Sequence, residues 1–107
     1  MKVLVTGSAG HLGEALVRTL RNQDVEVIGI DLIDSNFTDK VGTIIDLEFV
    51  GHCMKGIDIV LHTATLHKPH IATHRRHDFI DTNITGTLNL LEEAVASRIS
   101  AFIFTST

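Results

Sequence analysis

Three glycines that follow an apolar segment are the residues whose spacing most clearly predicts chemistry. The chain opens Met1-Lys-Val-Leu-Val-Thr-Gly-Ser-Ala-Gly-His-Leu-Gly13, in which a buried-strand pattern runs into the glycines. Glycine lets the backbone turn sharply and approach a ligand closely. A helix that begins here would aim free N–H groups and the positive end of its dipole at one point. The spacing therefore predicts a site for the pyrophosphate of a dinucleotide, with Gly7 in the turn, Gly10 against phosphate and Gly13 where helix and sheet pack closely.

Asp31, at the end of a second apolar segment, is the candidate for cofactor selectivity. A carboxylate there can accept hydrogen bonds from the hydroxyl groups of an adenosine ribose and would repel a 2′-phosphate. The next residues are Leu32 and Ile33, so no neighbouring arginine would neutralise such a phosphate. NAD is therefore expected in preference to NADP. Taken without the glycine turn, Asp31 would be interpreted as a solvated residue at a strand end.

Four histidines follow one another at helical spacing: His67, His70, His74 and His77. On one continuous helix they would share a face that suits Zn²⁺ or Ni²⁺. Pro69 separates the first of them from the predicted helix, and Arg75 and Arg76 bring positive charge beside the others. We therefore expect a solvated helix start and no metal site.

The composition is that of one ordinary globular domain over residues 1–107, with 44% hydrophobic and 21% charged residues. The net charge of −4 gives no reason to expect nucleic acid or an anionic membrane as a partner. No apolar stretch approaches the ~20 residues of a membrane span. Cys53 is the only cysteine, which excludes an intrachain disulfide and fits a reducing, cytoplasmic location.

The elements that must position these residues alternate between strand and helix patterns along the chain. An apolar stripe on the last helix consists of Ile80, Ile84, Leu88, Leu91 and Val95. The predicted strands are Lys2–Thr6, Val25–Asp31, Thr43–Ile45, Ile57–Thr63 and Ala101–Thr105, and the predicted helices are His11–Gln23, Glu48–Met54 and Ile71–Ser97.

This alternation predicts a three-layer Rossmann-like α/β fold with helices on both faces of a parallel sheet. Right-handed crossovers give about five strands in the order 3-2-1-4-5. Ligands of such sheets bind where the strand order reverses, at the carboxyl ends of strands one and four. The glycine turn and the segment Thr63–His67 are therefore expected to meet.

Six segments in order along the chain resemble the N-terminal half of the extended short-chain dehydrogenase/reductase family, which includes NAD-dependent epimerases and dehydratases. They are Val5–Gly13, which has G-x-x-G-x-x-G, Ile30-Asp31, Ile45-Asp-Leu47, Val60-Leu-His-Thr-Ala-Thr65, Asn83–Glu92 and Phe102-Ile-Phe-Thr-Ser-Thr107. Each segment is short, and together they span the chain.

The resemblance implies that Asp46 and Leu47 flank adenine, although Asp46 could equally be a helix cap. Thr63, Ala64 and Thr65 would line the pyrophosphate and the nicotinamide ribose, or would only connect a strand to a helix. Asn83 would bond backbone near the active site, and Gly86 in the same helix suggests close packing against the sheet. His52 and His62 are interpreted as ordinary packing or surface residues. The predicted cofactor contacts are Gly7, Gly10, His11, Leu12, Gly13, Asp31, Asp46, Leu47, Thr63, Ala64, Thr65 and Asn83.

One departure from the family concerns catalysis. Family members use a tyrosine, a lysine four residues later and a nearby serine or threonine, but this chain contains no tyrosine. Thr107 matches the serine/threonine position. We therefore expect the cofactor-binding part of a longer enzyme that transfers hydride at an alcohol carbon, with a sugar nucleotide or another alcohol or ketone as substrate, and no catalysis by this chain alone.

Two further hypotheses remain open from the sequence. One is a non-catalytic dinucleotide-binding or redox-sensing module, and the other is a structural fragment without a ligand. The last predicted strand would also present an apolar edge if nothing followed it, which predicts a homodimer or aggregation.

Overall fold

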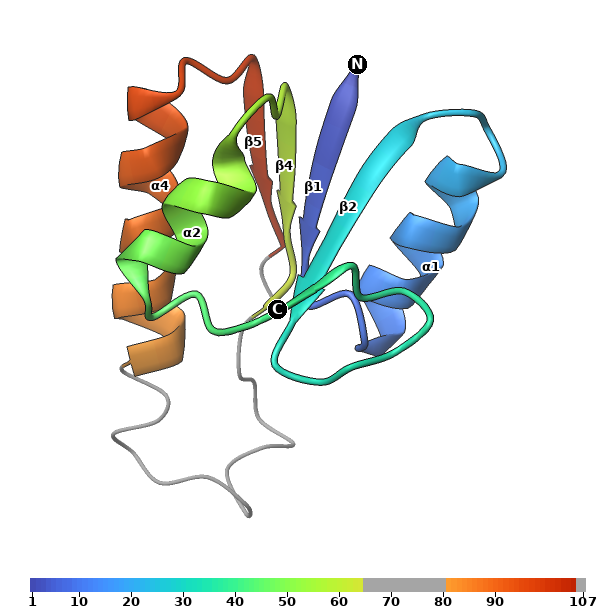
Figure 1. Cartoon of the computed structure of the whole chain (residues 1–107), viewed down its shortest axis with the longest axis horizontal. Coiled ribbons are helices and arrows are strands. Elements are labelled where there is room, and N and C mark those ends of the chain that lie inside the picture. The colour runs from blue at the N-terminus through green and yellow to red at the C-terminus, as the bar shows by residue number, and fades with distance from the viewer. Residues whose placement is uncertain (65–80, 106–107) are drawn as a thin grey trace.

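A computed structural model describes residues 1–64 and 81–105, and these form a parallel sheet flanked by helices (Figure 1). The described elements are β1 (Lys2–Thr6), α1 (His11–Arg21), β2 (Glu26–Asp31), β3 (Lys40–Val41), α2 (Leu47–Met54), β4 (Ile59–His62), the π-helical turn η2 (Asp81–Gly86), α4 (Thr87–Ala96) and β5 (Ala101–Phe104).

The sheet has five strands in the order β3-β2-β1-β4-β5, with every neighbouring pair parallel. This confirms the predicted fold class and strand order. In the register, Val5 of β1 lies between Gly29 of β2 and Leu61 of β4. Because β1 is central and covered on both faces, Val3, Leu4, Val5 and Thr6 are all buried, which explains its continuous apolar run.

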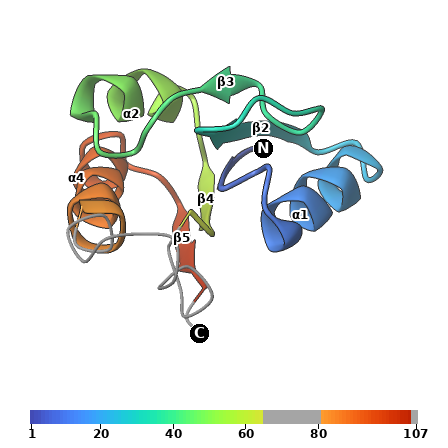
Figure 2. The same ribbon diagram turned by 90° about the horizontal axis from the view of Figure 1, so that it is seen from below.

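The sheet lies between α1 on one face and α2 and α4 on the other (Figure 2). A separate hydrophobic cluster fills the space on each face. On one face, Val17 of α1 packs with Val3 and Val5 of β1. On the other face, Leu4 lies in one cluster with residues of α2 and α4, among them Val50 and Leu90. Alternate residues of β1 therefore fill opposite layers, as the period of two in a strand requires.

The third strand differs from the prediction, because β3 is Lys40–Val41 and not Thr43–Ile45. Pairing starts before the predicted segment: the Asp39 N–H donates to the Gly29 carbonyl, and the Gly42 N–H donates to the Asp31 carbonyl. The residues predicted as strand instead form the turn into α2. Ile44 is buried there in the cluster beneath α2 and α4, so its burial and not strand pairing accounts for the apolar pattern.

The apolar stripe on the last helix faces outward, contrary to the usual meaning of such a pattern. Ile84, Leu88, Leu91 and Val95 are exposed, whereas Leu90 and Ala94 are buried. Gly86 lies on the packed side, where a Cβ would be 2.5 Å from side-chain carbons of Ile44. Gly86 is therefore closely packed, but against the turn before α2 and not against the sheet as expected. Residues 71–80 of the predicted helix lie outside the described residues.

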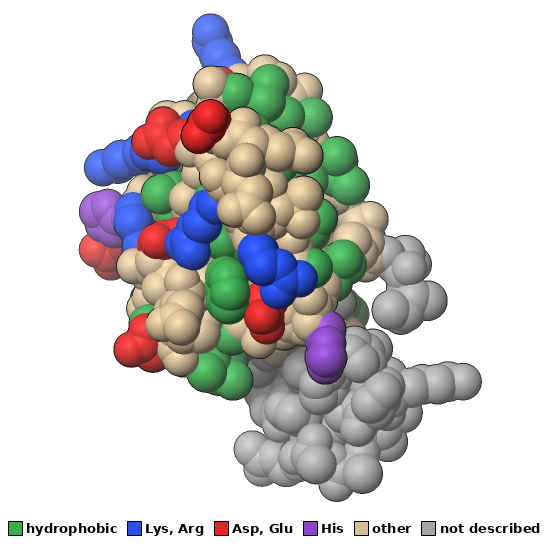
Figure 3. All heavy atoms as spheres, turned by 90° about the vertical axis from the view of Figure 1, so that its right-hand side faces the viewer, with side chains coloured by type: hydrophobic (Ala, Val, Ile, Leu, Met, Phe, Trp, Pro, Cys, Tyr) green, Lys and Arg blue, Asp and Glu red, His purple; other side chains and the backbone are tan. Residues whose placement is uncertain are grey.

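The side of the molecule that carries α1 shows positive and negative side chains interspersed, with hydrophobic ones between them (Figure 3). On this helix Arg18 pairs with Glu14, and Arg21 pairs with Asp39 of the segment after β2. Over residues 1–64 and 81–105, the structure contains no helix with the length and apolar character needed to cross a membrane.

Candidate functional site

The glycine turn after β1 is bonded to the end of β2. The N–H groups of Gly7 and Ser8 both donate to the Ile30 carbonyl, at 2.9 and 3.1 Å. Gly7 has a φ of +72°, a conformation that side chains rarely adopt, and a Cβ there would also lie 2.6 Å from the Thr63 hydroxyl. The predicted tight turn at Gly7 is therefore present, and it lies against the end of β4.

The other two glycines of the turn have different surroundings. A Cβ on Gly13 would lie 1.9 Å from the Gly7 carbonyl oxygen, so only glycine lets α1 approach the turn this closely. Gly10 has ordinary extended backbone, and within residues 1–64 and 81–105 a Cβ there would meet only the Gly7 carbonyl oxygen, at 3.4 Å. The fold therefore gives a reason for glycine at position 13 but not at position 10.

Helix α1 begins directly after Gly10, and no side chain caps its first N–H groups. His11 and Leu12, both predicted cofactor contacts, are exposed in this first turn. Free N–H groups at a helix start form an anion site when the surrounding surface is open. The exposed first turn thus has the form expected of a phosphate site.

Asp31 lies next to the glycine turn. Its carboxylate accepts from the Ala9 N–H at 3.0 Å through Oδ2 and from the Ile33 N–H at 2.9 Å through Oδ1. Each oxygen has a further lone pair, so these contacts leave the carboxylate able to accept from ribose hydroxyls. The structure thus brings the predicted ribose acceptor and the predicted phosphate turn together.

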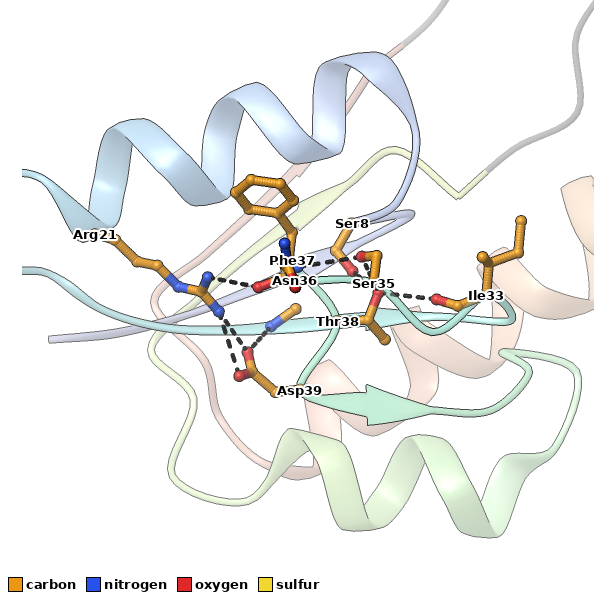
Figure 4. A network of polar contacts seen from close by, with 9 residues as sticks. Ser8, Arg21, Ile33, Ser35, Asn36, Phe37, Thr38 and Asp39 are labelled. Atoms are coloured by element: carbon orange, nitrogen blue, oxygen red, sulfur yellow. Dashed lines mark hydrogen bonds and ion pairs between the residues drawn. The ribbon is translucent and has the colours of Figure 1, made fainter.

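A polar network holds the segment after β2 against β2 and the glycine turn (Figure 4). The sequence patterns did not predict these contacts. Asp39 accepts from the Gly29 N–H at 2.7 Å and pairs with Arg21. The Thr38 hydroxyl contacts the buried Ser8 of the glycine turn at 3.0 Å. A glycine within the second strand was the available signal, because a Cβ on Gly29 would lie 2.0 Å from the Phe37 carbonyl oxygen.

Thr63 and Ala64, at the end of β4, are held against β1. Their N–H groups donate to the Thr6 hydroxyl oxygen at 3.0 and 3.1 Å, and the Thr63 hydroxyl donates to the Thr6 carbonyl at 2.5 Å. The predicted meeting of this segment with the glycine turn is therefore confirmed as far as residue 64. Thr65, like the catalytic candidate Thr107, lies outside the described residues.

His62, interpreted from sequence as an ordinary packing or surface residue, is fully buried and hydrogen-bonded through both ring nitrogens. Nδ1 lies 2.6 Å from the Thr6 hydroxyl and Nε2 lies 2.8 Å from the Thr87 hydroxyl. Burial lowers the pKa of the His62 imidazole to about 4. The only sequence signal was a polar residue within an apolar strand.

The remaining predicted contacts are spread over α2 and η2. Asp46 caps α2, since its Oδ1 accepts from the N–H groups of Glu48 and Phe49. Leu47 begins the helix and is exposed. Asn83 lies in η2, four residues before Thr87, in a part-buried position. The cap does not by itself decide whether Asp46 also meets adenine.

The histidines at positions 67, 70, 74 and 77 lie outside the described residues. Across residues 1–64 and 81–105, no group of three or more metal-ligating side chains is gathered. Cys53 lies on the buried side of α2, and its burial raises the pKa of the thiol. A raised pKa keeps the thiol protonated, so Cys53 belongs to the core.

Comparison with known proteins agrees with this geometry. The sequence model of the NAD dependent epimerase/dehydratase family matches residues 3–107. A UDP-glucose 4-epimerase of Erwinia amylovora is 28% identical over 99% of this chain and 36% of its own length. An uncharacterized membrane protein of Methanocaldococcus jannaschii is 25% identical over 98% of this chain and 35% of its own length. The chain thus spans about a third of the relatives it matches.

Solved structures give the same result. A short-chain dehydrogenase/reductase superfamily protein from Agrobacterium tumefaciens with bound NAD has a TM-score of 0.89 and 33% identity, over 100% of this chain and 33% of its own. The UDP-glucose 4-epimerase of Thermotoga maritima with UDP-glucose has a TM-score of 0.90 and 30% identity, over 100% of this chain and 38% of its own.

Proposed function

The chain belongs to the NAD-dependent epimerase/dehydratase family, and we propose that it binds NAD at the glycine turn as the cofactor part of a longer enzyme. The matched relatives extend well beyond the matched segment. The residues that select the substrate and complete the catalytic group would lie in the part of the whole protein that this match does not cover. The activity of the whole protein is therefore part of the proposal.

Gly10 is the observation that carries the proposal. Gly7 and Gly13 are required by the fold itself, whereas a Cβ on Gly10 would lie 3.4 Å from the Gly7 carbonyl oxygen, at the near edge of ordinary van der Waals contact. A glycine that the packing does not need, at an uncapped helix start, leaves space for a ligand to contact the backbone. The pyrophosphate of NAD has the charge that such a site favours.

The other residues of the site divide the dinucleotide between them. Asp31 would accept from the adenosine ribose hydroxyls, and its charge would oppose the 2′-phosphate of NADP. Thr63 and Ala64, held beside Gly7, would border the pyrophosphate and the nicotinamide ribose. Bound NAD would supply a hydride acceptor for an alcohol carbon of the substrate.

A sugar nucleotide is the substrate class that we propose for the whole enzyme. Two of the proteins similar to this chain are UDP-glucose 4-epimerases, and one of them was solved with UDP-glucose. In the family pattern a hydroxyl residue assists a tyrosine, and Thr107 is the residue of this chain that matches it. The tyrosine and its lysine would come from outside these residues.

Calorimetric titration of the chain with NAD and with NADP tests the proposal. We expect NAD to bind and NADP to bind at least tenfold more weakly, a difference of ~1.4 kcal/mol or more, because the 2′-phosphate and the Asp31 carboxylate carry like charges. Asp31→Asn should narrow the difference between the two dinucleotides, because it removes the charge and keeps an acceptor oxygen. Titration with no heat from either dinucleotide would contradict the proposal.

Gly10→Val and Gly13→Ala form a matched pair for the site assignment. Gly10→Val should leave the thermal midpoint of unfolding nearly unchanged and abolish NAD binding, because its side chain enters ligand space. Gly13→Ala should destabilise the chain by about 1–3 kcal/mol or more through overpacking. Undiminished NAD affinity in folded Gly10→Val would move the site away from the glycine turn.

A further inference from the structure

The imidazole of His62 joins two threonine hydroxyls from different elements. Its Nδ1 lies 2.6 Å from Thr6 Oγ1 at the end of β1, and its Nε2 lies 2.8 Å from Thr87 Oγ1 at the start of α4. The rings of Phe102 and Phe104 lie beside the imidazole, with centroids 6.0 and 5.2 Å away. His62 and Thr6 have no exposed surface.

The hydrogen bonds that Thr6 Oγ1 already accepts decide the tautomer of the His62 ring. This oxygen accepts from the N–H groups of Thr63 and Ala64, which occupies the two acceptor positions of a hydroxyl. Its own proton must therefore be donated, and Nδ1 is the acceptor at 2.6 Å. His62 is thus neutral with its proton on Nε2, and that proton is donated to Thr87.

In the opposite tautomer Nδ1 would carry the proton and would be a third donor to Thr6 Oγ1. The hydroxyl proton of Thr6 would then have no acceptor, because it would point at the proton on Nδ1. A charged imidazolium would create the same conflict. Buried polar groups without partners are costly, so the geometry admits one protonation state of the ring. The ring in turn fixes the direction of the Thr6 hydroxyl.

We propose that His62 is a positioning residue for the dinucleotide site, because it aims the Thr6 hydroxyl so that both lone pairs hold the Thr63–Ala64 turn. This turn touches Gly7: a Cβ on Gly7 would lie 2.6 Å from the Thr63 hydroxyl and 2.9 Å from the Ala64 nitrogen. A displaced turn would therefore move toward or away from the backbone that receives the phosphates. The role in binding rests on the proposed function.

Nuclear magnetic resonance of the ring nitrogens tests the first step in the wild-type chain. With a ¹⁵N-labelled sample near pH 7, the His62 correlations should show a protonated Nε2 and an unprotonated Nδ1. Hydrogen exchange should show protected Thr63 and Ala64 amides. A ring with the proton on Nδ1, or a charged ring, would overturn the inference without any variant.

Three variants test the second step. His62→Asn places an amide where Nδ1 was and can still accept from Thr6, whereas His62→Gln places its amide toward Thr87. His62→Leu removes both contacts at similar volume. We expect His62→Leu and His62→Gln to expose the Thr63 and Ala64 amides to exchange and to weaken NAD binding roughly tenfold, which is the effect of one hydrogen bond. His62→Asn should keep most of the amide protection and most of the NAD affinity of the wild-type chain.

The outcomes separate this inference from the proposed function. Equal NAD affinity and equal amide protection in the Asn, Gln and Leu variants would overturn the positioning role. If the wild-type chain binds no NAD, the proposed function fails, while the tautomer and the amide protection still decide whether His62 holds the turn. Thr6→Val gives a further check because it removes the hydroxyl that His62 would position. Adding His62→Leu to Thr6→Val should therefore cause little further loss of protection at the Thr63 and Ala64 amides.

Discussion

At the scale of the residue, polar side chains of the candidate site hold the backbone of the loops that surround it. Asp31 accepts from two N–H groups, one of them in the glycine turn. Thr6 accepts from two more at the end of β4. The loop ends that would receive a cofactor are therefore fixed before it binds, which lowers the ordering cost of binding.

The buried imidazole of His62 should make folding stability depend on pH. Its pKa is about 4 in the folded chain and about 6.5 when unfolded, so the unfolded chain binds the proton more strongly between these values. Stability should be full above about pH 6.5 and should fall by about 3 kcal/mol as the pH drops toward 4. Urea unfolding at pH 7, 5.5 and 4.5 measures this change.

The control for this prediction is His62→Asn, which has no ionisable group at the position. Other groups titrate in both proteins, so the difference between the two stability curves isolates His62. We expect the wild-type curve to be the steeper one over this range. Parallel curves would show that the His62 imidazole has the same pKa in the folded and the unfolded chain, which would contradict the pKa lowered by burial.

At the scale of the element, α2 depends on the cap at Asp46. Asp46→Ala removes the acceptor for the Glu48 and Phe49 N–H groups, at 3.0 and 3.3 Å. The loss should be about 1 kcal/mol of unfolding free energy. Asp46→Ser should keep most of this stability, because serine is also a good cap.

The same pair of variants separates the cap from a contact with adenine. If the Asp46 carboxylate also accepts from adenine, Asp46→Ser should weaken NAD binding while preserving the thermal midpoint. Calorimetry and thermal unfolding of the two variants give both quantities. Unchanged affinity in Asp46→Ser would restrict Asp46 to the capping role.

The helix α4 shows what an apolar period does and does not determine. The spacing of Ile84, Leu88, Leu91 and Val95 correctly indicated a helix, yet these residues are exposed and Leu90 and Ala94 are buried. The packed side is set by close approach to Ile44 at Gly86 and by the bonds of Asn89 to the Ile44 and Ile45 carbonyls. These partners are some 45 residues away in sequence, so a local pattern could not reveal them.

At the scale of the whole molecule, the exposed apolar side chains of α4 and β5 predict self-association. Val95 is 78% exposed and Leu88 51%, and Ile103 and Phe104 of β5 are exposed too. Exposed apolar side chains on a helix and on an edge strand favour contact between copies. We expect sedimentation velocity of the 107-residue chain to show dimers or larger species as concentration rises.

Charged substitutions identify the surface responsible. Leu88→Glu combined with Val95→Glu should shift the chain toward monomer at each concentration. Ile33→Glu changes an aliphatic residue with similar exposure after β2 and should leave the distribution unchanged. A wild-type chain that stays monomeric at every concentration would contradict the prediction.

The sequence by itself determined the parallel α/β fold, the order of its strands and the tight glycine turn, because these follow from local periods, glycine chemistry and the handedness of crossovers. Only the tertiary structure decided the position of β3, the outward face of α4 and the hydrogen bonds of the buried His62. Each depends on contacts between distant residues: Asp39 with Gly29, Gly86 with Ile44, and His62 with Thr6 and Thr87. A hydroxyl or an imidazole could bond many groups of the sequence, and only the folded chain decides which of them lie within reach.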